Sequence, residues 1–352
     1  MGIIKEVFGH DSHGEKVYSY TVTNEHGTRM RVIEIGAALQ SLEVADREGN
    51  FADVVLGFDN VEQYEKENGA NFGVVVGRNA NRIKNGHFVI NGKEYQLAIN
   101  DGRNNLHSGP DGYSLRKWSS EIVEDERGLA VRFSLISPDG DQGMPGELHI
   151  SAMYVLTEDD SVILEYEGVA GEDTIVNPTN HSYFNLAGHA SGTVHNQEMW
   201  LAAKEFTPSD SGLIPTGEYR SVKGTPMDFT EPKAIGRDIE ADYEPLVLAG
   251  GYDHNFVLDN KGEVELAASL YDSVSGRYME VFTQMPGIQI YTGNFLNGKV
   301  RGKDNCCYGK RGGVCFESQF FPDSVNNMAF ESPVAKAGVP FDFVTIYKFS
   351  VK

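Results

Sequence analysis

The segment GELHISAMYVLTEDDSVILEYEG, residues 146–168, alternates apolar and polar side chains on both sides of a short acidic turn. In its first half, apolar residues occupy every second position: Leu148, Ile150, Ala152, Tyr154 and Leu156. After the turn TEDDS, the alternation resumes at Val162, Leu164 and Tyr166. A period of two places all of these side chains on one face of an extended chain, so the segment predicts a β-hairpin with one buried face.

Similar patterns recur along the chain. Asn91-Gly92 separates two β-prone runs in FVINGKEYQL, residues 88–97, and this dipeptide is typical of a tight hairpin turn. Residues 264–284 alternate again around a Ser-Gly turn. Helix signals are few and short: FDNVEQYEKENG, residues 58–69, offers Asp59 or Asn60 as an N-cap. Many strands and few helices predict an all-β fold, a large antiparallel β-sandwich forming a single domain over residues 1–352.

Composition excludes several classes of partner. The formal net charge is −21, and a surface this acidic repels nucleic acid and anionic membranes. The three cysteines, Cys306, Cys307 and Cys315, are an odd number without metal-site spacing, which favours free thiols. The N-terminus lacks the pattern of a signal peptide, and no apolar run reaches 18 residues. These features predict a cytoplasmic protein.

Polar side chains cluster beside β-prone runs in five segments. These are GVVVGRNANRI (73–83), NNLHSGPDGY (104–113), NPTNHSYFNL (177–186), AGGYDHNFVL (249–258) and GGVCFESQFFPD (312–323). Arginine and asparagine side chains at a strand end can make paired hydrogen bonds to the hydroxyl groups of a ligand. For Arg78, a surface position in a solvated turn is equally compatible with the sequence. In the third segment, an extended chain would direct His181 and Tyr183 to one face and Asn180 and Ser182 to the other.

Glu317 is the strongest single candidate for chemistry. It lies within the apolar run Val314 to Phe321, where a carboxylate is costly unless it is paired or functional. Burial would raise its pKa towards the range of a general base, whereas simple alternation would turn it to solvent. The chain has no G-x-S-x-G, H-E-x-x-H or P-loop motif. The remaining groups predict proton transfer on a neutral polar substrate, without metal or cofactor.

The ordered set of motifs resembles the aldose 1-epimerase (galactose mutarotase) family over nearly the whole chain. GRNANRI, NNLH, NPTNHSYFNL, GYDHNFVL, GIQIYTGNFL and ESQFFPDSVN follow one another in family order. The resemblance implies the mutarotase-type supersandwich fold, with an open cleft on one sheet. It also implies interconversion of the α and β anomers of free hexoses, galactose or glucose, by a monomer or homodimer.

The resemblance assigns roles to matching positions. Glu317 is the general base for the C1 hydroxyl, His181 is the general acid for the ring oxygen, and His107 is the second histidine near that oxygen. The matching substrate-binding positions are Arg82, Asp253 and Gln289, with Asn81 and Tyr183 as further contacts.

Departures from the family pattern occur beside His107. Ser108 stands where the family usually has Gly, and the loop that follows differs, which leaves the preferred sugar open. A hexose-phosphate epimerase, a non-catalytic sugar-binding module and a glycosidase using Glu317 and Asp253 are the alternatives.

Overall fold

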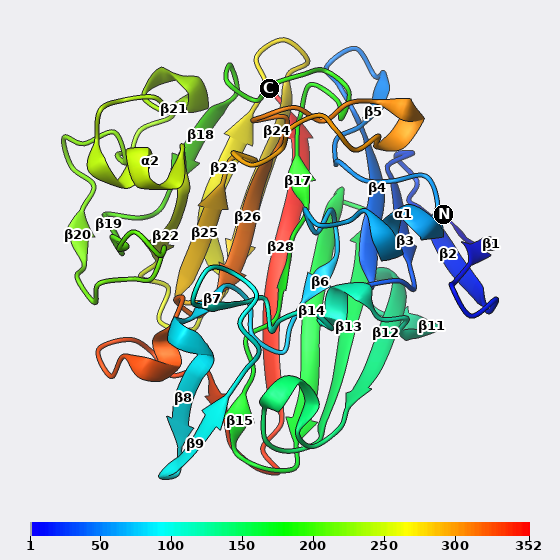
Figure 1. Cartoon of the computed structure of the whole chain (residues 1–352). Helices are drawn as coiled ribbons and strands as arrows, with labels where there is room; N and C mark the ends of the chain where they lie inside the picture. The colour runs from blue at the N-terminus through cyan, green and yellow to red at the C-terminus, as the bar shows by residue number, and fades with distance from the viewer. Residues whose placement is uncertain (1) are drawn as a thin grey trace.

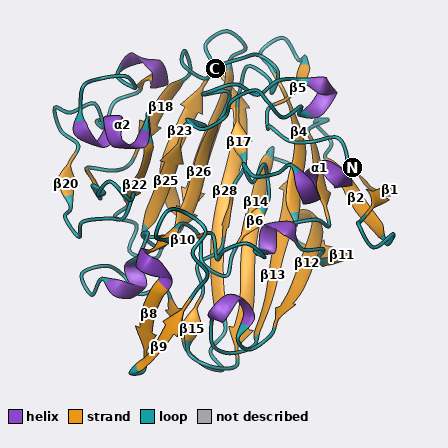
Figure 2. Ribbon diagram, viewed as in Figure 1, coloured by secondary structure: helices purple, strands orange, loops and turns teal. Residues whose placement is uncertain are grey.

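The computed structural model describes residues 2–352 and consists mainly of antiparallel strands (Figures 1 and 2). Its largest sheet has nine strands in the order β11-β12-β13-β14-β28-β24-β23-β18-β21. Their bounds are Ser119–Asp125 (β11), Gly128–Ser137 (β12), Leu148–Thr157 (β13), Ser161–Ala170 (β14), Phe341–Val351 (β28), Arg277–Thr283 (β24), Glu265–Tyr271 (β23), Glu198–Leu201 (β18) and Lys233–Ala234 (β21). The predicted all-β sandwich with few short helices is confirmed.

The hairpin predicted from residues 146–168 is formed by β13 and β14, which lie inside this sheet. The alternating apolar residues of β13, from Leu148 to Leu156, are at most 3% exposed, while His149 on the opposite face is exposed. The run 264–284 forms the predicted pair β23 and β24. Because the two faces of these strands differ in polarity, the sheet has one side that must be covered by a second layer.

Two further sheets pack on the nine-stranded sheet. A six-stranded sheet has the order β17-β26-β25-β22-β19-β20, and a five-stranded sheet has the order β1 to β5. The bounds of the six are Tyr183–Phe184 (β17), Val314–Gln319 (β26), Gly287–Tyr291 (β25), Asp253–Val257 (β22), Glu205–Phe206 (β19) and Arg220–Ser221 (β20). Those of the five are Gly2–His10 (β1), Lys16–Thr23 (β2), Arg29–Ile33 (β3), Ala38–Ala45 (β4) and Phe51–Asp53 (β5).

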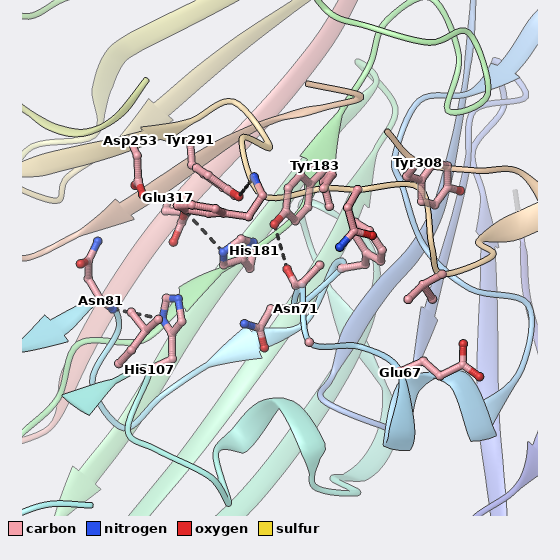
Figure 3. Close-up of a pocket in the computed structure, with 18 of the residues that line it drawn as sticks. Glu67, Asn71, Asn81, His107, His181, Tyr183, Asp253, Tyr291, Tyr308 and Glu317 are labelled. Atoms are coloured by element: carbon pink, nitrogen blue, oxygen red, sulfur yellow. Dashed lines mark hydrogen bonds and ion pairs between the residues drawn. The ribbon is translucent and has the colours of Figure 1, made fainter. Parts of the chain in front are cut away.

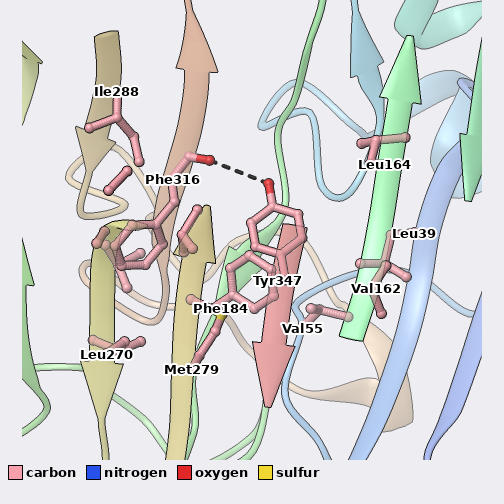
Figure 4. Packing of buried hydrophobic residues seen from close by; sticks show 14 of the residues in the cluster. Leu39, Val55, Val162, Leu164, Phe184, Leu270, Met279, Ile288, Phe316 and Tyr347 are labelled. Carbon is pink, nitrogen blue, oxygen red and sulfur yellow. Dashed lines mark hydrogen bonds between the residues drawn. The ribbon is translucent and has the colours of Figure 1, made fainter. Parts of the chain in front are cut away.

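The main hydrophobic core lies between these layers (Figure 4). Ile288 and Phe316, from the six-stranded sheet, face Leu270 and Met279, from the nine-stranded sheet. Tyr347 of β28 also joins the two layers, because its hydroxyl donates to the carbonyl oxygen of Phe316 at 3.4 Å. Burial of this apolar surface fixes which face of β26 is turned inwards.

Short elements complete the fold. Four two-stranded pairs are Val75–Val76 (β6) with Thr179–Asn180 (β16), Arg82–Ile83 (β7) with Asn105–Leu106 (β10), His87–Ile90 (β8) with Lys93–Gln96 (β9), and Thr174–Ile175 (β15) with Val334–Ala335 (β27). The hairpin β8–β9 is the one predicted at Asn91-Gly92.

The predicted helix is α1, Val61–Lys66, and the side chain of Asn60 caps it by accepting from the Gln63 amide. A second helix, α2, Glu244–Ala249, was not predicted. No helix within residues 2–352 is long and apolar enough to cross a membrane.

Candidate active site

Strand β26 presents Glu317 to a cavity on the outer face of the six-stranded sheet (Figure 3). Phe316, its neighbour in sequence, points into the core, so alternation turns Glu317 the other way. The cavity has a volume of about 380 Å³. Glu317 is only 2% exposed, which rules out the alternative of a solvent-facing side chain. Burial, together with the nearby carboxylate of Asp253, raises the pKa of Glu317 well above its usual value, while Arg82 opposes the shift.

His181 lies directly opposite Glu317. Its backbone is held on both sides, because its amide donates to Val74 and its carbonyl accepts from Gly73. The imidazole Nε2 is 3.7 Å from Glu317 Oε1, and the ring is buried. Burial lowers the pKa of His181 to about 4. This distance is too long for a normal hydrogen bond, and both pKa shifts favour the uncharged forms of the two groups.

His107 and Asn81 hold each other through two backbone contacts. The His107 amide donates to the Asn81 carbonyl at 3.0 Å, and the Asn81 amide donates to His107 Nδ1 at 3.1 Å. A backbone N–H can only donate, so Nδ1 must be unprotonated and the neutral ring carries its proton on Nε2. Burial, with nearby His181 and Arg82, lowers the pKa of His107 well below its usual value. His107 is therefore a fixed neutral donor rather than a base.

The same cluster offers donor types that could ligate a metal ion, and its geometry argues against that use. His107, His181 and Glu317 each bring one such atom to within 4.8 Å of the others. Ligation by His107 Nε2 would need a lone pair at that atom, which would move the proton to Nδ1. The Asn81 amide already points its hydrogen at Nδ1. The hydrogen bond at Nδ1 therefore opposes ligation of a metal ion by His107 Nε2.

Charged and amide groups line the end of the cavity next to Glu317. Arg82 borders the cavity, and its Nε donates to Asp101 at 2.7 Å. Asp253 also borders the cavity; burial raises its pKa, and Arg82 and a hydrogen bond from Gln289 oppose that shift. Gln289 itself does not line the cavity, and its amide donates to Asp253 Oδ1 at 2.6 Å. Gln289 thus holds the Asp253 carboxylate at the edge of the cavity.

Aromatic side chains also line the cavity, and sequence patterns had not indicated most of them. The rings lining the cavity are Phe72, Tyr183, Tyr291, Phe295 and Tyr308. Tyr183 was predicted as a substrate contact; its ring borders the cavity beside His181, and its hydroxyl donates to Ala70 at 2.9 Å. Aromatic lining with a few convergent polar groups is the usual construction of a small-molecule site.

The structure therefore brings seven of the eight predicted residues to one cavity, all except Gln289. Two other residues of these motifs, Arg78 and Asn180, do not line the cavity. Arg78 points into the interior and donates to the carbonyls of Pro145 and Gly146, so it is structural. Asn180 turns away from the cavity and donates to Gly73 and Tyr154, as the alternation around His181 predicted.

Comparisons with known proteins agree over the full chain. A family model described as aldose 1-epimerase matches residues 18–348. Galactose mutarotase from Bos taurus is 41% identical over 351 residues, covering 100% of this chain and 99% of that protein. Aldose 1-epimerase from Escherichia coli K12 is 34% identical over 340 residues, covering 96% of each. The solved structure of galactose 1-epimerase from Lactobacillus acidophilus superposes with a TM-score of 0.88 at 26% identity, over 99% of both chains.

Proposed function

The chain belongs to the aldose 1-epimerase family, and we propose that it interconverts the α and β anomers of free hexoses such as galactose and glucose. The observation that carries this proposal is the buried pair of Glu317 and His181, 3.7 Å apart beside one cavity. An acid and a base on one site can move two protons of a cyclic hemiacetal together. The relatives named as galactose mutarotases, up to 41% identical, support the choice of sugar.

The proposed reaction begins with the closed ring. Glu317, as carboxylate, takes the proton of the C1 hydroxyl, while protonated His181 gives its Nε2 proton to the ring oxygen. The bond between C1 and the ring oxygen breaks, and the open aldehyde forms. Rotation about the C1–C2 bond turns the other face of the carbonyl to the ring oxygen. Reclosure with both proton transfers reversed gives the other anomer.

The pair needs no proton from solvent during this cycle. The closed ring is bound by a carboxylate and an imidazolium, and the aldehyde is bound by a carboxylic acid and a neutral imidazole. Both states hold one transferable proton on the pair. The neutral state favoured by burial is the one that faces the aldehyde, which lowers the cost of reaching this intermediate.

The other cavity groups bind and orient the sugar in this proposal. His107 donates from Nε2 near the ring oxygen. Arg82, Asn81 and Asp253 bind hydroxyl groups, Gln289 holds Asp253, and Tyr183 packs against the ring. Such positioning converts the proton transfers into steps within one complex.

Polarimetry tests the proposal. Freshly dissolved α-D-galactose should reach its equilibrium rotation faster in proportion to the protein concentration. Unchanged rates with galactose, glucose and xylose would overturn it. Release of nitrophenol from nitrophenyl galactoside would instead indicate the glycosidase that uses Glu317 and Asp253.

A hexose-phosphate substrate is disfavoured by the charge of the cavity. Among residues 2–352, Arg82 is the one Lys or Arg side chain that lines it, whereas Glu67, Asp253 and Glu317 are acidic. Phosphate recognition usually draws on several converging cations. We expect glucose to be accelerated and the anomers of glucose 6-phosphate to exchange no faster than without enzyme, as followed by NMR of their anomeric signals.

Replacing Asp253 with Asn should weaken substrate binding. The change removes a charged acceptor next to the sugar, worth about 1.5–3 kcal/mol, so KM should rise roughly 10- to 100-fold while kcat falls less. The loss of a negative charge should also lower the pKa of Glu317, which Asp253 raises, and move the alkaline fall of kcat/KM to lower pH. An unchanged KM would remove Asp253 from the binding site.

The pH profile should reflect the two shifted pKa values. Below about pH 4 the pair carries two protons, because His181, with its pKa lowered to about 4, becomes charged while Glu317 is protonated. No base is then available, so kcat/KM should fall below about pH 4 and recover above it. On the alkaline side, kcat/KM should fall as the pair loses its last proton, and the raised pKa of Glu317 moves this fall to higher pH. An acidic fall centred near 6.5 would contradict this.

We also propose that the protein acts as one domain in the cytoplasm, as a monomer or homodimer. The three free cysteines support a reducing compartment. Cell fractionation and sedimentation of the purified protein would test location and assembly.

A further inference from the structure

Strand β26 contacts both ring nitrogens of His181. Glu317 Oε1 lies 3.7 Å from Nε2, and Cys315 Sγ lies 3.6 Å from Nδ1. The two side chains are two residues apart, so they project from the same face of the strand. Cys315 is fully buried and pairs in register with Tyr183 of β17, which brings its thiol under the His181 ring.

Within residues 2–352, Cys315 Sγ is the one hydrogen-bonding partner of His181 Nδ1, and His181 is the one partner of the thiol. Cys315 does not line the cavity, and so it does not reach the sugar. Through this hydrogen-bond contact, Cys315 can influence the reaction only by way of His181.

We propose that Cys315 is a positioning residue that accepts a hydrogen bond from Nδ1–H of His181 and thereby keeps Nε2 as the atom that exchanges its proton. This inference rests on the proposed function. In ring opening, Nε2 gives up its proton and must end with a lone pair. The remaining proton then has to stay on Nδ1 through the whole cycle, and the sulfur is the acceptor that faces it there.

The opposite tautomer would stop the reaction. If the thiol donated its hydrogen to Nδ1, neutral His181 would carry its proton on Nε2, and loss of that proton would create an imidazolate. The thiol also cannot restore the Nδ1–H form by giving its proton to Nδ1 and becoming a thiolate. Burial, together with Glu317 and Asp253, raises the pKa of the Cys315 thiol well above its usual value. Only the Nδ1–H form can both give and take a proton at Nε2.

A sulfur acceptor also suits an acid that must release its proton readily. A carboxylate at this position would stabilise the imidazolium and raise its pKa, as in other His–carboxylate pairs. A neutral sulfur is a weak acceptor and leaves the pKa of His181 low. The other titratable or charged groups facing this centre are Glu317, Asp253, Arg82, His107, Tyr183 and Tyr291.

Substitutions at Cys315 test the proposal. Cys315→Val keeps an apolar side chain of similar size and removes the acceptor; we expect kcat to fall about tenfold and KM to stay within about twofold. Cys315→Ser keeps a group that can accept from Nδ1–H and should retain at least about a third of kcat. Cys307→Val, at an exposed cysteine, is the matched control and should leave kcat unchanged. Thermal melting identifies any variant that is not folded.

The decisive readout is the tautomer itself, measured without sugar. Nitrogen-15 NMR of histidine-labelled protein near pH 7 should show His181 protonated at Nδ1 in the wild type and in Cys315→Ser, and shifted towards Nε2–H in Cys315→Val. The proposal is overturned if the wild type carries its proton on Nε2. It is also overturned if Cys315→Val keeps both the Nδ1–H form and full kcat, or if the Ser and Val variants lose kcat equally. Absence of mutarotation in the wild type would instead sink the proposed function, and the tautomer would still be measured.

Discussion

Replacing Glu317 with Gln is expected to reduce kcat for galactose mutarotation by roughly 10²–10⁴-fold, the range that one general base contributes. The amide has the shape of the carboxyl group but cannot take the C1 hydroxyl proton. KM should change little, because Arg82, Asn81 and Asp253 still border the cavity. Initial rates from polarimetry over a range of galactose concentrations measure both constants.

The fold should tolerate this change. Glu317 is 2% exposed, and its Oε2 has no hydrogen-bond partner among the described residues. Removing a buried ionisable group should therefore leave the melting temperature unchanged or raise it. Glu67→Gln is the matched control, since Glu67 is an exposed carboxylate at the far rim of the same cavity, and kcat should stay within about twofold. A Glu317→Gln enzyme with more than a third of wild-type kcat would exclude Glu317 as the base.

Replacing His181 with Asn is the second large effect, an expected loss of roughly 10²–10³-fold in kcat. Asparagine cannot protonate the ring oxygen, although the backbone bonds to Val74 and Gly73 that hold this position remain. The fall in kcat/KM below about pH 4 should also move to higher pH, because the remaining titration is that of Glu317, whose pKa is raised. The pH dependence of the residual rate checks this.

The His181 result separates catalysis from folding. A circular dichroism spectrum and melting temperature close to those of the wild type show that the sandwich is intact. His149→Asn, at an exposed histidine in β13, is the control and should leave kcat unchanged. A His181→Asn enzyme with kcat within about threefold of the wild type would assign the acid to another group.

Local patterns predicted the sheets well because strand alternation is a local property. The period of two in β13 and β14 identified the buried face, and Asn91-Gly92 identified the β8–β9 turn. Helix α2 was missed although Pro245 in its first turn and left-handed Gly250 at its end are typical helix boundaries. Its six residues were too short to show a helical period.

The site was predicted where motifs carried it, and missed where contacts join distant segments. Glu317 stood out as a carboxylate in an apolar run, whereas the contact of Cys315 with His181 joins residues 134 positions apart. Arg78 and Arg82 share one motif, and only the path of the chain shows that Arg78 is structural and Arg82 borders the cavity. Gln289 lies behind Asp253 and donates a hydrogen bond to it, which no spacing in the sequence reveals.

Exchange NMR at anomeric equilibrium tests the central claim most directly. Galactose labelled with carbon-13 at C1 gives separate α and β signals, and cross peaks between them report interconversion without any net reaction. We predict cross peaks that grow with wild-type enzyme concentration and are absent with an equal amount of Glu317→Gln. Equal cross peaks from both proteins, or none from the wild type with either galactose or glucose, would contradict anomer exchange by this buried acid–base pair.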